Sequence, residues 1–129
     1  MKIFRLHKLV RDDIVADMQN MGQKVQVRVL GDAEYIESLR QKIHEEIAEF
    51  DAASPQPLKE LADVHEALEQ LVATLGGTMS EVSDLQSQKA KKAGRFKKRM
   101  FVETVTLADD DPWVEYYSAD PVRFPPVQP

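Results

Sequence analysis

The chain has 129 residues, a formal net charge of −5 and 43% hydrophobic residues, which fits one globular domain with one core. The negative charge argues against general binding to a DNA or RNA polymer, because that needs a basic face to neutralise phosphates. The absence of cysteine excludes disulfides, thiolate metal sites and cysteine nucleophiles. No apolar run reaches the ~20 residues of a membrane span or the shorter core of a signal peptide, so we expect a cytoplasmic protein with no membrane partner.

The first half of the chain predicts two helices and a short strand. An apolar residue recurs every four positions and predicts a helix over about residues 8–21, which Gly22 ends. Valines alternate with polar residues over residues 24–29, the pattern of a half-buried strand. Asp32 is a suitable N-cap for a second helix over about residues 32–53, whose apolar side chains form one stripe.

The second half predicts two more helices and a second strand. The proline-containing residues 54–57 break the second helix, and a third helix then runs to about Leu75. Thr78 fits the first position of a capping box that opens a fourth helix, which ends at about Ala93. Residues 101–105 predict a strand that can pair with the valine strand.

The composition changes at residue 108. Five of the seven prolines and four of the nine aromatic residues follow it, which predicts a tail without helix whose aromatic rings pack on something. We therefore expect a helical domain over residues 1–107 and an irregular tail over residues 108–129. The expected fold is mainly α: a compact bundle of about four helices with a minor two-stranded β element, completed by oligomerisation.

Acidic residues gather on the second and third predicted helices. At about 100° per residue, Glu46 lies beside the apolar stripe of its helix and Glu49 lies one step further round, while Glu45 points outward. Glu60 and Asp63 border an apolar surface of a helix that is apolar on two sides. Carboxylates in that setting either become protonated or find a cation.

The sequence offers these carboxylates no local counter-charge, because no lysine or arginine lies within residues 43–50 or 60–69. A single acidic residue on a helix is more commonly a solvated surface residue. Hard oxygen donors in this number suit Mg²⁺ or Mn²⁺, whereas a set without cysteine is a poor match to a usual zinc site. The acidic cluster therefore predicts a site for Mg²⁺, with Mn²⁺ as the alternative ion.

The acidic cluster also has a motif. Glu45-Glu46-x-x-Glu49 followed by Glu60-x-x-Asp63 resembles the EExxE…ExxD signature of the all-α NTP pyrophosphohydrolases. That superfamily includes MazG, the all-α dUTPases and the phosphoribosyl-ATP pyrophosphohydrolases.

Other segments resemble a MazG-like, phosphoribosyl-ATP-pyrophosphohydrolase-like subgroup of the same superfamily. Residues 8–12 read KLVRD, like the opening of that subgroup, and residues 61–66 are similar to its third helix. The chain is also similar to the subgroup's basic, glycine-containing segment, at Lys89, Lys92, Gly94, Phe96 and Arg99. The chain departs from the usual pattern at residues 13–15 and 93–96, which leaves the choice of substrate open.

The resemblance implies hydrolysis of a nucleoside triphosphate between its α- and β-phosphorus atoms, giving a monophosphate and pyrophosphate, in the removal of non-standard nucleotides. It implies Mg²⁺ ligands at Glu46, Glu49, Glu60 and Asp63, with Glu45 as the general base. The residues expected to bind the substrate phosphates are Lys8, Arg11, Lys89, Lys92 and Arg99.

Two alternatives stay open. One is a phosphoribosyl-ATP pyrophosphohydrolase of histidine biosynthesis, which shares the reaction type and much of the fold by resemblance. The other is a non-catalytic helical interaction protein whose acidic helices bind a partner, which the five-carboxylate set without basic neighbours disfavours. Because the third helix is apolar on two sides, we also expect a homodimer or homotetramer with helical faces in contact.

Overall fold

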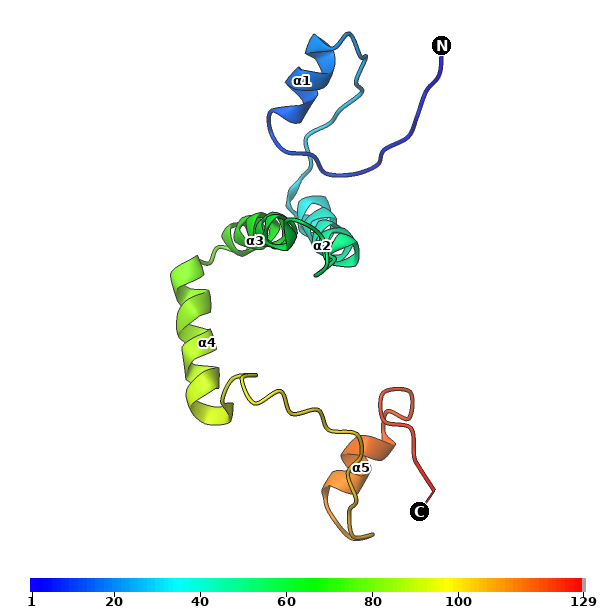
Figure 1. Ribbon diagram of the computed structural model, residues 1–129, viewed down its shortest axis with the longest axis vertical. Helices are drawn as coiled ribbons and strands as arrows, with labels where there is room; N and C mark the ends of the chain where they lie inside the picture. Colours follow the sequence, from blue (N-terminus) through cyan, green and yellow to red (C-terminus); the bar gives the residue numbers. More distant parts are fainter. Residues whose placement is uncertain (129) are drawn as a thin grey trace. The chain divides into compact units, whose positions relative to one another are not determined.

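The computed structural model describes residues 1–128, and the regular structure of these residues is helical (Figure 1). Its five helices are α1 (Ile14–Asn20), α2 (Asp32–Glu49), α3 (Pro57–Thr74), α4 (Met79–Ala93) and α5 (Trp113–Ser118). The chain divides into two units, Met1–Lys92 and Ala93–Pro129. The expected mainly α class is confirmed. Within residues 1–128, no helix combines the length and the apolar character needed to cross a membrane.

Helices α2 and α3 pack against each other and hold the buried residues of the first unit. Leu39 of α2 is 2% exposed and Ala67 of α3 is 6% exposed. Glu46 of α2 is also buried, with 8% of its surface exposed. The core of this unit therefore lies on the helix pair that carries the acidic motif.

The boundaries of α3 and α4 confirm the sequence prediction. Pro57 occupies the first turn of α3, where its missing N–H would have no helical partner. After α3, Gly76 adopts a left-handed φ of 81°. The Oγ1 of Thr78 accepts a hydrogen bond from the N–H of Glu81 at 3.1 Å, which is the capping contact expected at the start of α4.

Helix α2 ends four residues earlier than predicted, at Glu49. Phe50 is extended, with φ −61° and ψ 127°, and two side chains then hold the following turn. Asp51 Oδ1 accepts the N–H of Ala53 at 2.8 Å, and Glu60 Oε2 accepts the N–H of Asp51 at 3.0 Å. These bonds satisfy donors that a longer helix would have used.

Helix α1 is much shorter than the predicted helix over residues 8–21. It begins only at Ile14, after Asp12 and Asp13, because aspartate is unfavourable inside a helix and favourable at the N-terminus of a helix. Residues 8–11, which include Lys8 and Arg11, are therefore not helical, and the predicted helix is wrong for this segment.

The predicted two-stranded element is not confirmed. Residues 1–128 contain no strand, and the segments 24–29 and 101–105 belong to different units. Val29 and Phe101 are 97% and 88% exposed, so neither of these side chains is packed against a neighbour. An extended segment becomes a strand only when its backbone forms hydrogen bonds with a neighbouring strand.

The C-terminal unit contains a short helix where we expected none. Helix α5 starts directly after Pro112, and Asp111 Oδ1 accepts the N–H of Trp113 at 2.8 Å. The expectation was wrong because the prolines stand outside the helix, where proline is tolerated. The aromatic rings pack on one another with centroids 5.0 to 6.4 Å apart, a typical range for such pairs; they are Trp113, Tyr116, Tyr117 and Phe124.

An ion pair ties the segment before α2 to its first turn. The guanidinium of Arg28 donates two hydrogen bonds to Glu34, at 3.1 and 2.6 Å. These hydrogen bonds, and next the charge of Arg28, lower the pKa of Glu34 from its ordinary value. A negative charge in the first turn also suits the helix dipole.

We expect Glu34→Gln to lower the free energy of unfolding at neutral pH and to have no effect in strong acid. A carboxyl whose pKa is lowered by folding contributes stability that is complete above its unfolded pKa of about 4.3. That contribution is lost as the pH falls through the lower pKa of the folded state. Urea denaturation of both proteins across this range measures the difference, and a difference that does not change with pH would contradict the role of the pair.

Candidate functional site

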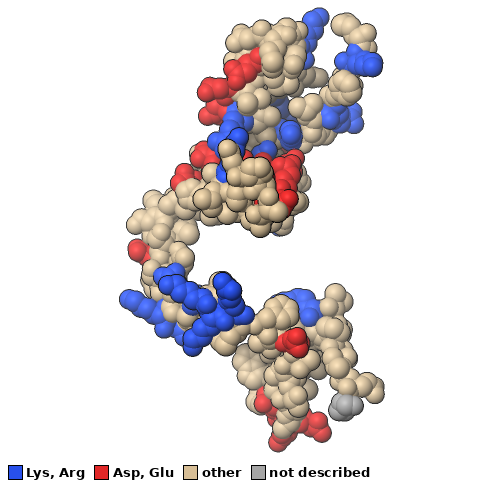
Figure 2. All heavy atoms as spheres, in the orientation of Figure 1, with Lys and Arg blue, Asp and Glu red and all other residues tan. Residues whose placement is uncertain are grey.

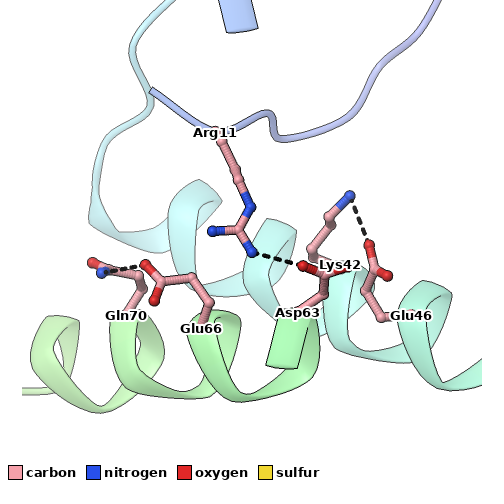
Figure 3. A network of polar contacts seen from close by, with 6 residues as sticks. All are labelled: Arg11, Lys42, Glu46, Asp63, Glu66 and Gln70. Atoms are coloured by element: carbon pink, nitrogen blue, oxygen red, sulfur yellow. Dashed lines mark hydrogen bonds and ion pairs between the residues drawn. The ribbon is translucent and has the colours of Figure 1, made fainter. Parts of the chain in front are cut away.

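An ion pair connects the N-terminal segment to α3 (Figure 3). Arg11 extends from the non-helical residues before α1, and its Nη2 donates a hydrogen bond to Asp63 Oδ1 at 2.8 Å. A hydrogen bond between two charged groups is stronger than a neutral one. The contact brings together the KLVRD segment and the ExxD motif, which are 52 residues apart in the sequence.

A second ion pair lies on α2. Lys42 Nζ is 3.1 Å from Glu46 Oε1, one helical turn away (Figure 3). Only 11% of the Glu46 side chain is exposed. A carboxylate buried to this extent is costly unless a cation compensates its charge, and Lys42 provides that compensation.

The interpretation that the acidic cluster has no local counter-charge is therefore wrong. Lys42 stands one residue before the segment that contains no basic residue, and its spacing of four from Glu46 was the signal that could have found it. Arg11 comes from a distant part of the sequence, and no local pattern predicts its partner.

The other predicted acidic residues have different surroundings. Glu60 is half-buried and bonded to the N–H of Asp51, whereas Glu49 is exposed at the last residue of α2. Glu45 is half-buried beside an open hollow of about 300 Å³ between α2 and the N-terminal segment. Lys8 and Lys42 line the same hollow, so the structure brings a predicted phosphate-binding residue close to the predicted base.

The remaining predicted phosphate-binding residues are exposed, and Figure 2 shows the basic side chains of the surface in blue. Lys89 and Lys92 lie in the second half of α4. Arg99 belongs to the C-terminal unit, where it adopts a left-handed φ of 56°. The ion pairs on α2 and α3 do not include these three residues.

The carboxylate oxygens of the acidic residues are ligands that suit Mg²⁺, but these side chains do not surround a common point. Within residues 1–128, no three acidic or histidine side chains are grouped so that they could hold a metal ion. Glu46 and Asp63 are each bonded to a basic side chain, and Glu60 to a backbone N–H. Three of the four predicted ligands therefore already have partners in the folded chain.

Comparisons with protein-family models, with curated proteins and with solved structures found no match. The resemblance carried by the three motifs therefore stays a prediction made from the residues themselves.

Proposed function

We propose that the protein is a Mg²⁺-dependent nucleoside triphosphate pyrophosphohydrolase that removes non-standard nucleotides. The observation that carries the proposal is the contact between Arg11 and Asp63, at 2.8 Å. It puts a cation suited to phosphate beside a carboxylate suited to a metal ion, and it joins two motifs that are distant in the sequence. The buried carboxylate of Glu46 on the packed partner helix supports the same site.

The roles of the residues follow from their chemistry. The predicted ligands Glu46, Glu49, Glu60 and Asp63 would hold Mg²⁺, which supplies neutralisation of the phosphate oxygens and a template for in-line attack. Glu45, beside the hollow, would accept a proton from the attacking water. The cations proposed for the triphosphate and the leaving pyrophosphate are Lys8, Arg11, Lys89, Lys92 and Arg99.

A pyrophosphate-release screen tests this proposal. The purified full chain would be incubated with standard and oxidised or deaminated nucleoside triphosphates, and with phosphoribosyl-ATP, in Mg²⁺ or in EDTA. We expect equal amounts of nucleoside monophosphate and pyrophosphate, in Mg²⁺ only. Preference for phosphoribosyl-ATP would favour the enzyme of histidine biosynthesis instead. Release of orthophosphate, or no turnover of any substrate, would contradict the proposal.

The two ion pairs also bear on the interaction-protein alternative. They give the acidic residues basic partners, which weakens the sequence argument against a non-catalytic helical module. The two functions differ in their response to metal, since a ligand that binds the folded state raises its stability as the ligand concentration increases. A melting temperature that does not rise with Mg²⁺ would favour the interaction protein.

We also propose that the chain assembles as a homodimer or homotetramer. Leu58 of α3 and Leu75, the residue directly after α3, are 76% and 67% exposed, while Leu39 and Ala67 are the buried apolar residues within residues 1–128. A second copy would cover the exposed apolar side chains of α3, and the extended segments supply backbone groups that can pair in such an assembly. Light scattering at tens of micromolar should give at least twice the mass of one chain, and the mass of a single chain would contradict this proposal.

A further inference from the structure

The basic partners of Asp63 and Glu46 occupy the carboxylates that the proposed function assigns to Mg²⁺. We propose that Arg11 and Lys42 are exchange cations: each neutralises one of these carboxylates in the metal-free chain, releases it to a divalent cation, and then turns to the substrate phosphates. The proposal rests on the proposed function and adds Lys42 to its phosphate-binding residues.

Competition between the two kinds of cation follows from charge and geometry. Arg11 bonds Asp63 Oδ1 at 2.8 Å, and Lys42 lies 3.1 Å from Glu46 Oε1. A divalent ion on the same carboxylates would repel a guanidinium or ammonium group at these distances. The two basic side chains and a metal ion would therefore compete for these carboxylates.

The two pairs differ in how readily they separate. The Arg11 side chain is 60% exposed and starts from a non-helical segment, so its pair with Asp63 is of the weak surface type. Glu46 is buried, and the loss of Lys42 alone would leave its charge uncompensated. Lys42 is therefore free to leave only when another cation takes its place, which couples its release to metal binding.

In the proposed exchange, the ammonium group of Lys42 would turn from Glu46 toward the hollow beside α2. Lys42 and Lys8 both line it, and Glu45 lies at the same wall. Its volume of about 300 Å³ is at the lower end of the range for ligand pockets, roughly 300–1,000 Å³, and leaves room for a phosphate group. A phosphate in this hollow would attract the ammonium group that Glu46 releases.

Calorimetric titration of the full chain with Mg²⁺ tests the exchange without any turnover. Arg11→Gln and Lys42→Gln each remove a competing cation, so we expect Mg²⁺ to bind more tightly to both variants than to the wild type. The gain should be roughly two- to fivefold for Arg11→Gln, the range of a modest surface ion pair, and larger for Lys42→Gln, whose partner Glu46 is buried. Arg40→Gln is the matched control, because it removes a positive charge from α2, the helix that carries Lys42. Arg40 pairs with the exposed Glu37 at 3.1 Å and not with a predicted metal ligand. The control substitution should leave the affinity for Mg²⁺ nearly unchanged.

A second titration uses an α,β-imido nucleoside triphosphate with saturating Mg²⁺. Here the effect has the opposite sign: Arg11→Gln and Lys42→Gln should bind the analogue about tenfold more weakly, as expected for a lost charged hydrogen bond. Lys42→Arg keeps the charge and should restore most of the affinity. A circular dichroism spectrum equal to that of the wild type establishes that each variant is folded.

The outcomes separate the two proposals. Saturable Mg²⁺ binding with equal affinity in the wild type, Arg11→Gln and Lys42→Gln would overturn the exchange and leave the proposed function standing. Tighter Mg²⁺ binding in all variants, Arg40→Gln included, would also overturn it, because general electrostatics would then explain the gain. No saturable Mg²⁺ binding to any of the proteins, with or without the analogue, would overturn the proposed function itself.

Discussion

Asp63→Asn should reduce Mg²⁺-dependent release of pyrophosphate by at least about 100-fold, since even residues that only support metal ligands cost about 10- to 100-fold when they are changed. The change removes a ligand charge and keeps the volume of the side chain. The asparagine Oδ1 still accepts a hydrogen bond from Arg11, so the local structure should persist. Initial rates of pyrophosphate release at saturating Mg²⁺ measure the effect.

The same variant should change stability little. The Asp63 side chain is 39% exposed, and a pair of this kind contributes about 0–1 kcal/mol. Asp84→Asn, on the exposed surface of α4, makes the same chemical change away from the site and should keep full activity. Equal turnover by the Asp63 variant and the wild type would remove Asp63 from the metal site.

Leu39→Ala should lower the free energy of unfolding by about 2–5 kcal/mol, the usual cost of deleting a buried leucine side chain. Leu39 is 2% exposed on the helix that packs against α3. The total stability of a domain is only about 5–15 kcal/mol, so this one change removes a large part of it. Urea denaturation followed by far-ultraviolet circular dichroism gives the measurement.

The control for this prediction is a leucine that the folded chain leaves in water. Leu85 on α4 is 64% exposed, and Leu85→Ala should change the free energy of unfolding by less than about 0.5 kcal/mol. Equal losses in the two variants would mean that the contact between α2 and α3 is not the main source of stability.

Local signals explain which parts of the fold the sequence predicts well. The start of α3 and the cap of α4 depend on Pro57 and Thr78, whose effects act within one turn of the chain. The end of α2 depends on the carboxylate of Glu60, which bonds a turn nine residues earlier. The helical period continues across that turn, so the pattern alone predicts a longer helix.

In the candidate site, too, the sequence predicts the local features and not the contacts between distant residues. The sequence places the acidic residues on two helices, and the structure packs these helices together. Charge neutralisation is a property of the folded chain, so the pair of Arg11 with Asp63 is beyond local sequence reasoning. The pair of Lys42 with Glu46 could have been predicted from the sequence, because residues four apart on a helix are neighbours on its surface.

The aromatic cluster of the C-terminal unit has a practical consequence for spectroscopy. Trp113 is the only tryptophan in the sequence, and its ring centroid lies 5.3 Å from that of Tyr116 and 6.4 Å from that of Tyr117. Its fluorescence, including emission excited through these tyrosines, therefore reports on the C-terminal unit. Far-ultraviolet dichroism reports mainly on α2, α3 and α4, the long helices. Denaturation curves recorded with both signals on one sample would coincide if the two units unfold together and separate if they do not.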